Sequence, residues 1–177
     1  DIPQKISIGV LAAQAPEREN VSRFVFGGDS ADGLIGGSKS DRLYGGLGAD
    51  FLTGGAGDDY LEGGAGMDVY NFGAVKNFLT ANTNDGNDTI LDTDGKGVLR
   101  YTFADGSNPI SPTVQTTAIA GIALSTSGTT WQSINGKFIF TKQSGAPGTT
   151  DLKVTISGDA GGTITLQNYH DGDFGIR

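Results

Sequence analysis

The stretch GGDSADGLI GGSKSDRLY GGLGADFLT GGAGDDYLE GGAGMDVYN, residues 27–71, repeats one nine-residue unit five times. Each unit begins with Gly-Gly, places Asp sixth and places a bulky apolar residue eighth. The constant aspartates are Asp32, Asp41, Asp50, Asp59 and Asp68, and the apolar residues are Leu34, Leu43, Leu52, Leu61 and Tyr70. A fixed short period decides an architecture before other features do. A disordered Gly-rich linker has no reason to hold two positions in phase. We therefore interpret these residues as folded.

The unit divides into six turn residues and three strand residues. Glycine adopts positive φ in tight turns at little cost, and only the middle residue of a three-residue strand points inward. Two units therefore make one full coil, with a turn at each edge and a short strand on each face. Because stacked strands lie ~4.8 Å apart, each turn stacks directly against the turn two units later. This stacking pairs Asp32 with Asp50, Asp41 with Asp59, and Asp50 with Asp68.

Such aspartate pairs predict a bound cation. Two carboxylates ~5 Å apart repel by roughly 1 kcal/mol in water and by about 3 kcal/mol at an effective dielectric of 20. The five inward side chains form a small core for 45 ordered residues, so the repeats are expected to be unfolded without metal. Calcium accepts roughly six to eight oxygen ligands in flexible geometry, whereas magnesium prefers a strict octahedron and keeps its waters.

The pattern resembles the calcium-binding nonapeptide GGxGxDxUx of the RTX (repeats-in-toxin) family, closely over residues 27–71 and more loosely over 84–97. The resemblance implies a calcium-binding parallel β-roll, a right-handed β-helix of nine-residue repeats, in a toxin or another type I-secreted bacterial protein. It also implies the type I secretion machinery as a partner and an extracellular location. That machinery uses an uncleaved C-terminal signal, so a start at Asp1 without a signal peptide is compatible with export.

The resemblance also implies the ligands of each ion. In RTX rolls the earlier turn supplies the carbonyls of places two and four with its Asp. The turn two units later supplies the carbonyls of places one and three with its Asp. The first implied set is Gly28, Ser30, Asp32, Gly45, Leu47 and Asp50. The second is Gly37, Lys39, Asp41, Gly54, Ala56 and Asp59, and the third is Gly46, Gly48, Asp50, Gly63, Ala65 and Asp68.

Ser30 and Lys39 depart from the family pattern, which has Gly at place four. Positive φ costs a non-glycine residue roughly 1 kcal/mol or more. Lys39 also brings a positive charge to its ion, so the second site is predicted to be the weakest.

Two further turns extend the expected count from three ions to at most five. Asp85 and Asp88 form a sixth turn, expected to stack on Gly55, Gly57 and Asp59. Asp92 and Asp94 form a seventh turn, expected to stack on Gly64, Gly66 and Asp68. The alternative for 92–97 is a plain polar turn, because Asp and Gly are common in all turns.

The composition of the chain excludes several kinds of partner and of covalent or metal site. The chain has 177 residues, 30 glycines, 18% charged residues, a net charge of −8 and no cysteine. An acidic chain is not expected to bind nucleic acid or an anionic membrane, and no apolar run is long enough for a transmembrane segment. Disulfides and thiolate metal sites are excluded. Bound metal can replace the disulfides that small secreted domains often use.

The order of segments predicts an all-β chain. Residues 1–26 are a lead-in with a first rung at 22–26 and a possible strand at 5–11. Residues 27–97 are the roll, with an apparent insertion near 74–83. Residues 98–177 are an antiparallel β-hairpin cap that begins with a strand at 98–104. One hairpin is expected around Asn135-Gly136 and a looser one around 158–162, with Trp131 in the core of the cap. No role is assigned to residues 105–130.

The leading functional hypothesis is a non-enzymatic calcium-binding module that folds on extracellular calcium and supports the secretion and stability of a larger secreted protein. One alternative is an adhesive module with structural calcium, in which exposed Phe51 or Tyr60 contacts a carbohydrate or another cell-surface partner. Another is the C-terminal part of a secreted lipase or protease. His170 with Asp171 and Asp173 suggests chemistry, but no nucleophile motif or second histidine accompanies it, so no catalytic residue and no cofactor besides calcium is predicted.

Overall fold

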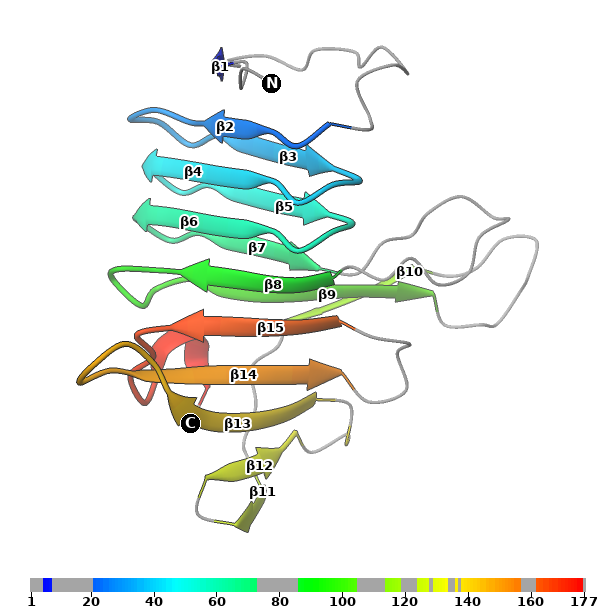
Figure 1. Cartoon of the computed structure of the whole chain (residues 1–177), viewed down its shortest axis with the longest axis vertical. Coiled ribbons are helices and arrows are strands. Elements are labelled where there is room, and N and C mark those ends of the chain that lie inside the picture. Colours follow the sequence, from blue (N-terminus) through cyan, green and yellow to red (C-terminus); the bar gives the residue numbers. More distant parts are fainter. Residues whose placement is uncertain are drawn as a thin grey trace.

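The computed structural model describes residues 5–7, 21–72, 86–104, 114–118, 124–127, 129–133, 136, 138–156 and 162–176. Apart from the short 3-10 turn η2 (Asp173–Gly175), the regular elements in these ranges are strands, which confirms the all-β prediction (Figure 1). The expected insertion near 74–83, Asp85 and most of 105–130 lie outside the described residues.

Eight strands form a roll with two faces, and each face is a parallel sheet. One face carries β2 (Phe24–Phe26), β4 (Arg42–Leu47), β6 (Tyr60–Ala65) and β8 (Gly86–Leu91); the other carries β3 (Gly33–Gly37), β5 (Phe51–Gly55), β7 (Val69–Phe72) and β9 (Val98–Ala104). Neighbouring strands on one face pair in parallel with an 18-residue offset, as in Leu43↔Leu61 and Leu34↔Leu52. This register confirms the predicted coil of two units.

The insertion leaves the stacking intact. Leu61 pairs with Ile90 and Tyr70 with Leu99, an offset of 29 residues on each face. This offset exceeds the usual 18 residues by 11 on both faces, so the insertion lengthens the connection without changing which residues pair. The sixth and seventh turns therefore lie over the fourth and fifth, as the sequence predicts.

The core of the roll consists of the eighth residue of each unit. Leu43, Leu52, Leu61 and Tyr70 are fully buried, and Leu34 is 2% exposed. In β3 to β6 the strand neighbours of these leucines are exposed or half-buried, because side chains alternate along a strand, whereas in β7 Val69 and Phe72 are buried as well. In β3 to β6 a single large apolar side chain per strand is buried, so the interior of these coils is narrow and the turns contribute strongly to the fold.

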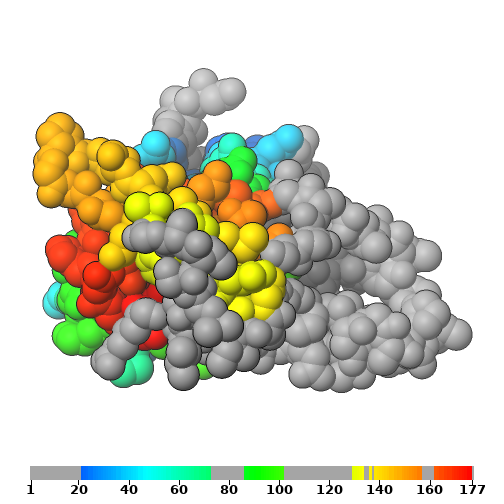
Figure 2. Space-filling model, turned by 90° about the horizontal axis from the view of Figure 1, so that it is seen from below, coloured from blue at the N-terminus to red at the C-terminus, as the bar shows by residue number. Residues whose placement is uncertain are grey.

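The C-terminal strands continue one sheet of the roll. β15 (Gly162–Gln167) pairs in parallel with β8, and β14 (Thr150–Ile156), β13 (Phe138–Ser144), β12 (Thr130–Gln132) and β11 (Leu124–Ser127) follow in antiparallel order. At the opposite end, β1 (Lys5–Ser7) pairs in parallel with β2. Seen along the roll from the capped end, the cap strands and the C-terminal segment form much of the visible face, with the roll strands at its margins (Figure 2).

The cap differs from its prediction at the boundary. The strand expected at 98–104 exists as β9, but it pairs in parallel with β7, so the pairing of the roll extends past residue 97 to Tyr101. On its other side β9 pairs antiparallel with β10 (Val114–Ala118). The two predicted hairpins are present as β12–β13 and β14–β15. Trp131 packs against the core and stacks on Phe140, with ring centroids 6.0 Å apart.

Candidate metal centre

The sixth residues of the units form two ladders of buried carboxylates, one at each edge of the roll. Each backbone N–H donates to Oδ1 of the aspartate in the next turn on the same edge. At one edge Asp32 donates to Asp50 at 2.8 Å and Asp50 to Asp68 at 2.9 Å. At the other edge Asp41 donates to Asp59 at 2.7 Å and Asp59 to Asp88 at 3.0 Å. Oδ1 therefore serves the stacking of the coils.

The second carboxylate oxygen is left for another partner. Oδ2 of Asp41, Asp50 and Asp68 is buried and accepts no hydrogen bond. A buried carboxylate oxygen without a donor is strongly unfavourable unless a cation compensates it. The ladders thus contain acceptors that the protein itself does not satisfy.

Main-chain carbonyls converge on the same points. A Cβ atom added to Gly45 would lie 2.3 Å from Asp50 Oδ2 and 2.4 Å from the carbonyl oxygen of Gly63, one coil later. A Cβ atom added to Gly27 would lie 2.9 Å from Asp32 Oδ2 and 2.3 Å from the Gly45 carbonyl oxygen. Glycine at place one leaves room beside a carboxylate and a carbonyl, a donor set that suits calcium. The residues present therefore fit the ion that the sequence predicts.

The carboxylates of the ladders are held at an electrostatic cost. Burial raises the pKa of Asp50, against a hydrogen bond from the Asp32 N–H, and the charges of Asp68 and Asp32 raise it further. Burial also raises the pKa of Asp68, to which the charge of Asp94 adds. A divalent cation near Oδ2 favours the charged form and removes this penalty.

Glycine at places two and four follows from stacking. In the third to fifth turns these residues have positive φ, as in Gly48 (122°) and Gly57 (114°). A Cβ atom on Gly48 would lie 2.6 Å from the backbone carbon of Ser30, in the turn beneath. Only glycine allows this close approach.

Ser30 and Lys39, which stand at place four of their units, do not need to be glycine. Neither adopts positive φ, so the backbone strain predicted for them is wrong. They belong to the first turn of each edge, and it is the following turn, with Gly48 or Gly57, that stacks on them. The exposed charge of Lys39 is the remaining reason to expect a weaker second ion.

The predicted sixth turn is partly described. Asp88 is 3% exposed and continues the ladder from Asp59, and Gly86 has a φ of 95°. A Cβ atom on Gly86 would lie 1.9 Å from the Gly57 carbonyl oxygen, so this turn stacks as the earlier ones do. Its other predicted ligand, Asp85, lies outside the described residues.

In the seventh turn, Asp92 and Asp94 lie over the fifth turn, but their carboxylates are already hydrogen-bonded. Asp92 accepts from the backbone N–H of Gly95 at 2.8 Å, and Asp94 accepts from Lys96 Nζ at 3.0 Å. Sequence reasoning missed the partners of this turn. The available signal was Tyr70, which replaces the leucine of the other units.

Within the described ranges, no three His, Cys, Asp or Glu side chains come together as a metal-binding group. The predicted ligand sets, in contrast, each combine two carboxylates with several main-chain carbonyls. His170 is mostly exposed, with Nδ1 3.5 Å from Asp173 Oδ2.

Residues 35–70 match the family described as the RTX calcium-binding nonapeptide repeat, in four copies. The chain contains an RTX-type calcium-binding module. A similar solved structure is the solution structure of the AlgE6R3 subunit from the Azotobacter vinelandii mannuronan C5-epimerase, at 20% identity and a TM-score of 0.46, covering 94% of this chain and 78% of that chain. The chain has no match among curated proteins.

The RTX geometry reaches beyond the matched residues. The ladder of backbone N–H to Oδ1 hydrogen bonds begins at Arg23, which donates to Asp41 at 2.6 Å, and it ends at Asp88. Neither end lies within residues 35–70. In the part of the chain that the structure describes, no helix is long and apolar enough to cross a membrane.

Proposed function

We propose that this RTX module is a non-enzymatic folding switch that orders on extracellular calcium and stabilises a larger secreted protein. The observation that supports the proposal is the pair of aspartate ladders. Oδ2 of Asp41 and of Asp50 is buried, accepts no hydrogen bond and lies beside a carbonyl oxygen of the next turn on its edge. Such an arrangement is unfavourable in an empty roll and favourable around a cation.

The predicted ligand sets assign a role to each part of the unit. The carboxylates and the carbonyls at places one to four would hold the ions, and the glycines keep those carbonyls accessible. When bound, calcium supplies positive charge and a flexible coordination sphere of oxygen ligands. Asp50 belongs to two sets, so neighbouring coils depend on each other. A ligand that binds only the folded state raises the free energy of unfolding by about 2.7 kcal/mol per site when its concentration is a hundred times Kd.

The proposal includes the setting in which the switch works. Calcium is scarce in the cytosol, so the chain would remain unfolded there and suit export through a type I secretion system. Outside the cell, the same chain would fold. The RTX repeat supports this setting, as does a cysteine-free sequence in which metal replaces disulfides.

A calcium titration of the full chain, followed by far-ultraviolet circular dichroism from excess chelator, tests the switch. The β signal is expected to rise with calcium and to stay low in magnesium at the same concentration. A β signal in chelator equal to that in calcium would overturn the folding switch, although not calcium binding itself.

One surface favours a second candidate function, a carbohydrate-binding module with structural calcium. On the outer side of β2, β4 and β6, Phe26 stacks on Tyr44 with ring centroids 5.0 Å apart and an interplanar angle of 9°. Tyr44 contacts Tyr60 at 5.8 Å, and the Arg42 guanidinium lies 5.6 Å from the Tyr60 ring centroid. Tyr60 donates to Glu62 at 3.1 Å. A row of three outer-face rings, beside charged groups that form hydrogen bonds, suits the faces and hydroxyls of a sugar chain.

Gel retardation in soluble polysaccharides tests this candidate. Tyr44→Ala should abolish any retardation, because Tyr44 is the central ring. Phe51→Ala is the matched control, since Phe51 is 46% exposed on the opposite sheet. Equal retardation of wild type and Tyr44→Ala would exclude this face as the binding surface.

A further inference from the structure

The seventh turn exchanges the two most constant residues of the unit. The register Val69↔Val98 aligns Gly97 with Asp68, the sixth place, and aligns Asp92 with Gly63, the first place. The aspartate therefore stands where the other turns have glycine, and glycine stands where they have aspartate.

The carboxylate of Asp92 nevertheless returns to the usual position. A Cβ atom on Gly97 would lie 2.4 Å from Asp92 Oδ2, so that oxygen fills the space beside place six. Asp92 Oδ1 accepts from the N–H groups of Gly95 at 2.8 Å and Asp94 at 3.2 Å. Asp92 Oδ2 accepts from the Tyr70 hydroxyl at 3.2 Å. In contrast to the carboxylates of Asp50 and Asp68, both oxygens of Asp92 have donors.

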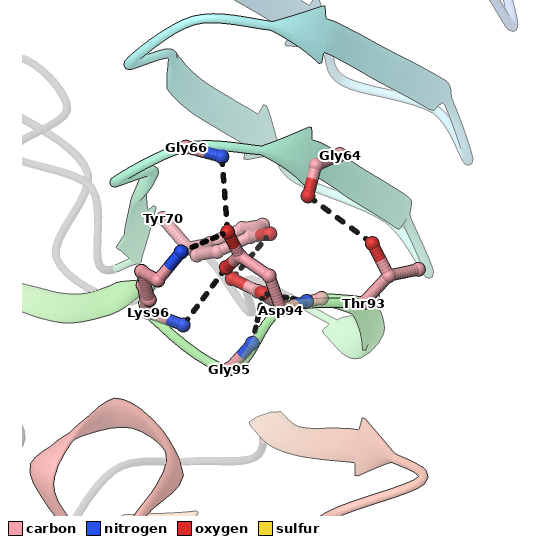
Figure 3. A network of polar contacts seen from close by, with 8 residues as sticks. Gly64, Gly66, Tyr70, Thr93, Asp94, Gly95 and Lys96 are labelled. Carbon is pink, nitrogen blue, oxygen red and sulfur yellow. Dashed lines mark hydrogen bonds and ion pairs between the residues drawn. The ribbon is translucent and has the colours of Figure 1, made fainter.

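The Tyr70 hydroxyl takes the place of a predicted ligand (Figure 3). A Cβ atom on Gly63 would lie 2.3 Å from this hydroxyl. At Gly45 the corresponding neighbour, at 2.4 Å, is the place-one carbonyl oxygen of the turn above. The hydroxyl also accepts from the Gly63 N–H at 3.0 Å. A buried phenol thus occupies the point where a carbonyl faces the ion in the earlier turns.

The other predicted ligands of the fifth and seventh turns also form hydrogen bonds within the protein (Figure 3). The Thr93 hydroxyl donates to the Gly64 carbonyl at 3.2 Å. Asp94 Oδ2 accepts from the Gly66 N–H at 3.2 Å and from Lys96 Nζ at 3.0 Å. A protein ammonium group therefore neutralises the one acidic side chain that remains in the turn.

The C-terminal segment holds this turn from the far side. Phe174 packs against Tyr70 with ring centroids 5.9 Å apart, and its N–H donates to the Gly95 carbonyl at 3.2 Å. A Cβ atom on Gly95 would lie 2.4 Å from Asp173 Oδ1. The seventh turn is thus enclosed by protein and not by another repeat.

The opposite edge ends in a comparable way. Arg23 precedes Asp41 by one coil; its N–H donates to Asp41 Oδ1 at 2.6 Å, and its guanidinium donates to the Gly36 carbonyl. A cationic side chain therefore already lies at the first turn of that ladder.

We propose that the seventh turn binds no calcium and that Tyr70, Asp92 and Lys96 close the ladder with the chain's own donors. The inference rests on the proposed calcium-dependent stacking and limits its extent. Four turn pairs remain for ions, namely first with third, second with fourth, third with fifth, and fourth with sixth. The fifth ion that the sequence suggests is replaced by a hydrogen-bonded tyrosine.

Native mass spectrometry of the full chain in saturating calcium tests this inference. Asp92→Asn and Tyr70→Phe should keep the wild-type number of ions. Tyr70→Phe should also lower the thermal midpoint in saturating calcium, because it removes the bridge between Gly63 and Asp92. Thr53→Val, which removes an outer-face hydroxyl that accepts from Asn71, is the matched control and should change the ion count not at all and the midpoint little. Loss of one ion from Asp92→Asn or Tyr70→Phe would overturn the inference.

A gain-of-site variant provides the complementary test. The triple change Tyr70→Leu, Asp92→Gly and Gly97→Asp removes the phenol and restores the consensus residues at places one and six of the seventh turn. This variant should bind one ion more than wild type. A folded triple variant with the wild-type count would contradict the inference. A wild type that binds ions without folding on them would contradict the proposed function and leave these differences in count measurable.

Discussion

At the scale of single residues, each ladder aspartate has two tasks. In Asp50, for example, Oδ1 accepts the N–H of the coil before it, and the buried Oδ2, which has no donor, is the oxygen proposed to bind the ion. Removing one such side chain therefore affects both the stacking and the ions. The cost should depend on how many turns share that residue.

Asp50→Ala is expected to raise the calcium midpoint more than Asp32→Ala. Asp50 is fully buried, accepts from the Asp32 N–H and belongs to two predicted ligand sets. Its loss leaves a part-buried donor unsatisfied, at a cost of about 1–3 kcal/mol, besides weakening two ions. Asp32 is half-buried and belongs to one set. Midpoints from calcium titrations of both full-length variants decide the matter; a larger shift for Asp32→Ala would show that successive turns do not share ions.

Gly48→Ala and Gly33→Ala form a second pair of residue-scale variants. Gly48 has a φ of 122°, and a Cβ atom there would lie 2.6 Å from the backbone of Ser30, whereas one on Gly33 would have nothing within 4 Å. We expect Gly48→Ala to destabilise the calcium-bound roll by more than about 1 kcal/mol, and Gly33→Ala to change it little. Thermal midpoints in saturating calcium measure both, and equal midpoints would contradict the stacking argument.

The position of a unit in the stack decides whether it needs glycine at place four. The repeat predicted the positions of the aspartates and of the inward residues correctly. It assigned strain to Ser30 and Lys39 because the family has glycine there. The glycine is needed only where a turn lies beneath, and a unit by itself does not show whether it is the first on its edge.

At the scale of strands and hairpins, the local sequence predicted the hairpins but not the pairings between distant strands. Asn135-Gly136 and the alternating strands near 152–169 predicted two hairpins that the structure contains as β12–β13 and β14–β15. The parallel contact between β8 and β15 joins segments 76 residues apart, as in Asn87↔Thr163. No local pattern encodes such a contact. The parallel pairing of β9 with β7 escaped prediction because an insertion displaces its register.

The β8–β15 contact predicts that the cap supports the roll. Leu166 is fully buried and pairs with Ile90, the inward residue of β8. Leu166→Ala should cost about 2–5 kcal/mol and raise the calcium midpoint, because it leaves a cavity under the last coil. Gln167→Ala, at the exposed neighbouring position, is the control. Urea unfolding in calcium gives both values, and an unchanged calcium midpoint for Leu166→Ala would mean that the roll folds without support from the cap.

At the scale of the whole molecule, the fold without calcium and the fold with calcium should respond to pH in opposite directions. Burial raises the pKa of Asp41, Asp50 and Asp68, and it raises that of Asp92 to about 6. The folded chain without metal therefore binds protons more tightly than the unfolded chain does. Its stability is greatest below the unfolded pKa of about 3.9 and is lost as pH rises through the folded values. Asp94, whose desolvation is outweighed by hydrogen bonds from Lys96, acts in the opposite sense.

Acidification in chelator from pH 7 to about 4.5 should thus increase β structure, because the ladder carboxylates take up protons at higher pH in the folded chain than in the unfolded chain. In calcium the same change should raise the calcium midpoint, because protons compete for the carboxylate oxygens that would hold the ions. Circular dichroism at fixed temperature over this range, with and without calcium, gives both curves. Asp50→Asn provides the control, because a neutral side chain at that position should flatten the response in chelator. A chelator curve that falls on acidification would show that the buried aspartates are not what keeps the metal-free roll unfolded.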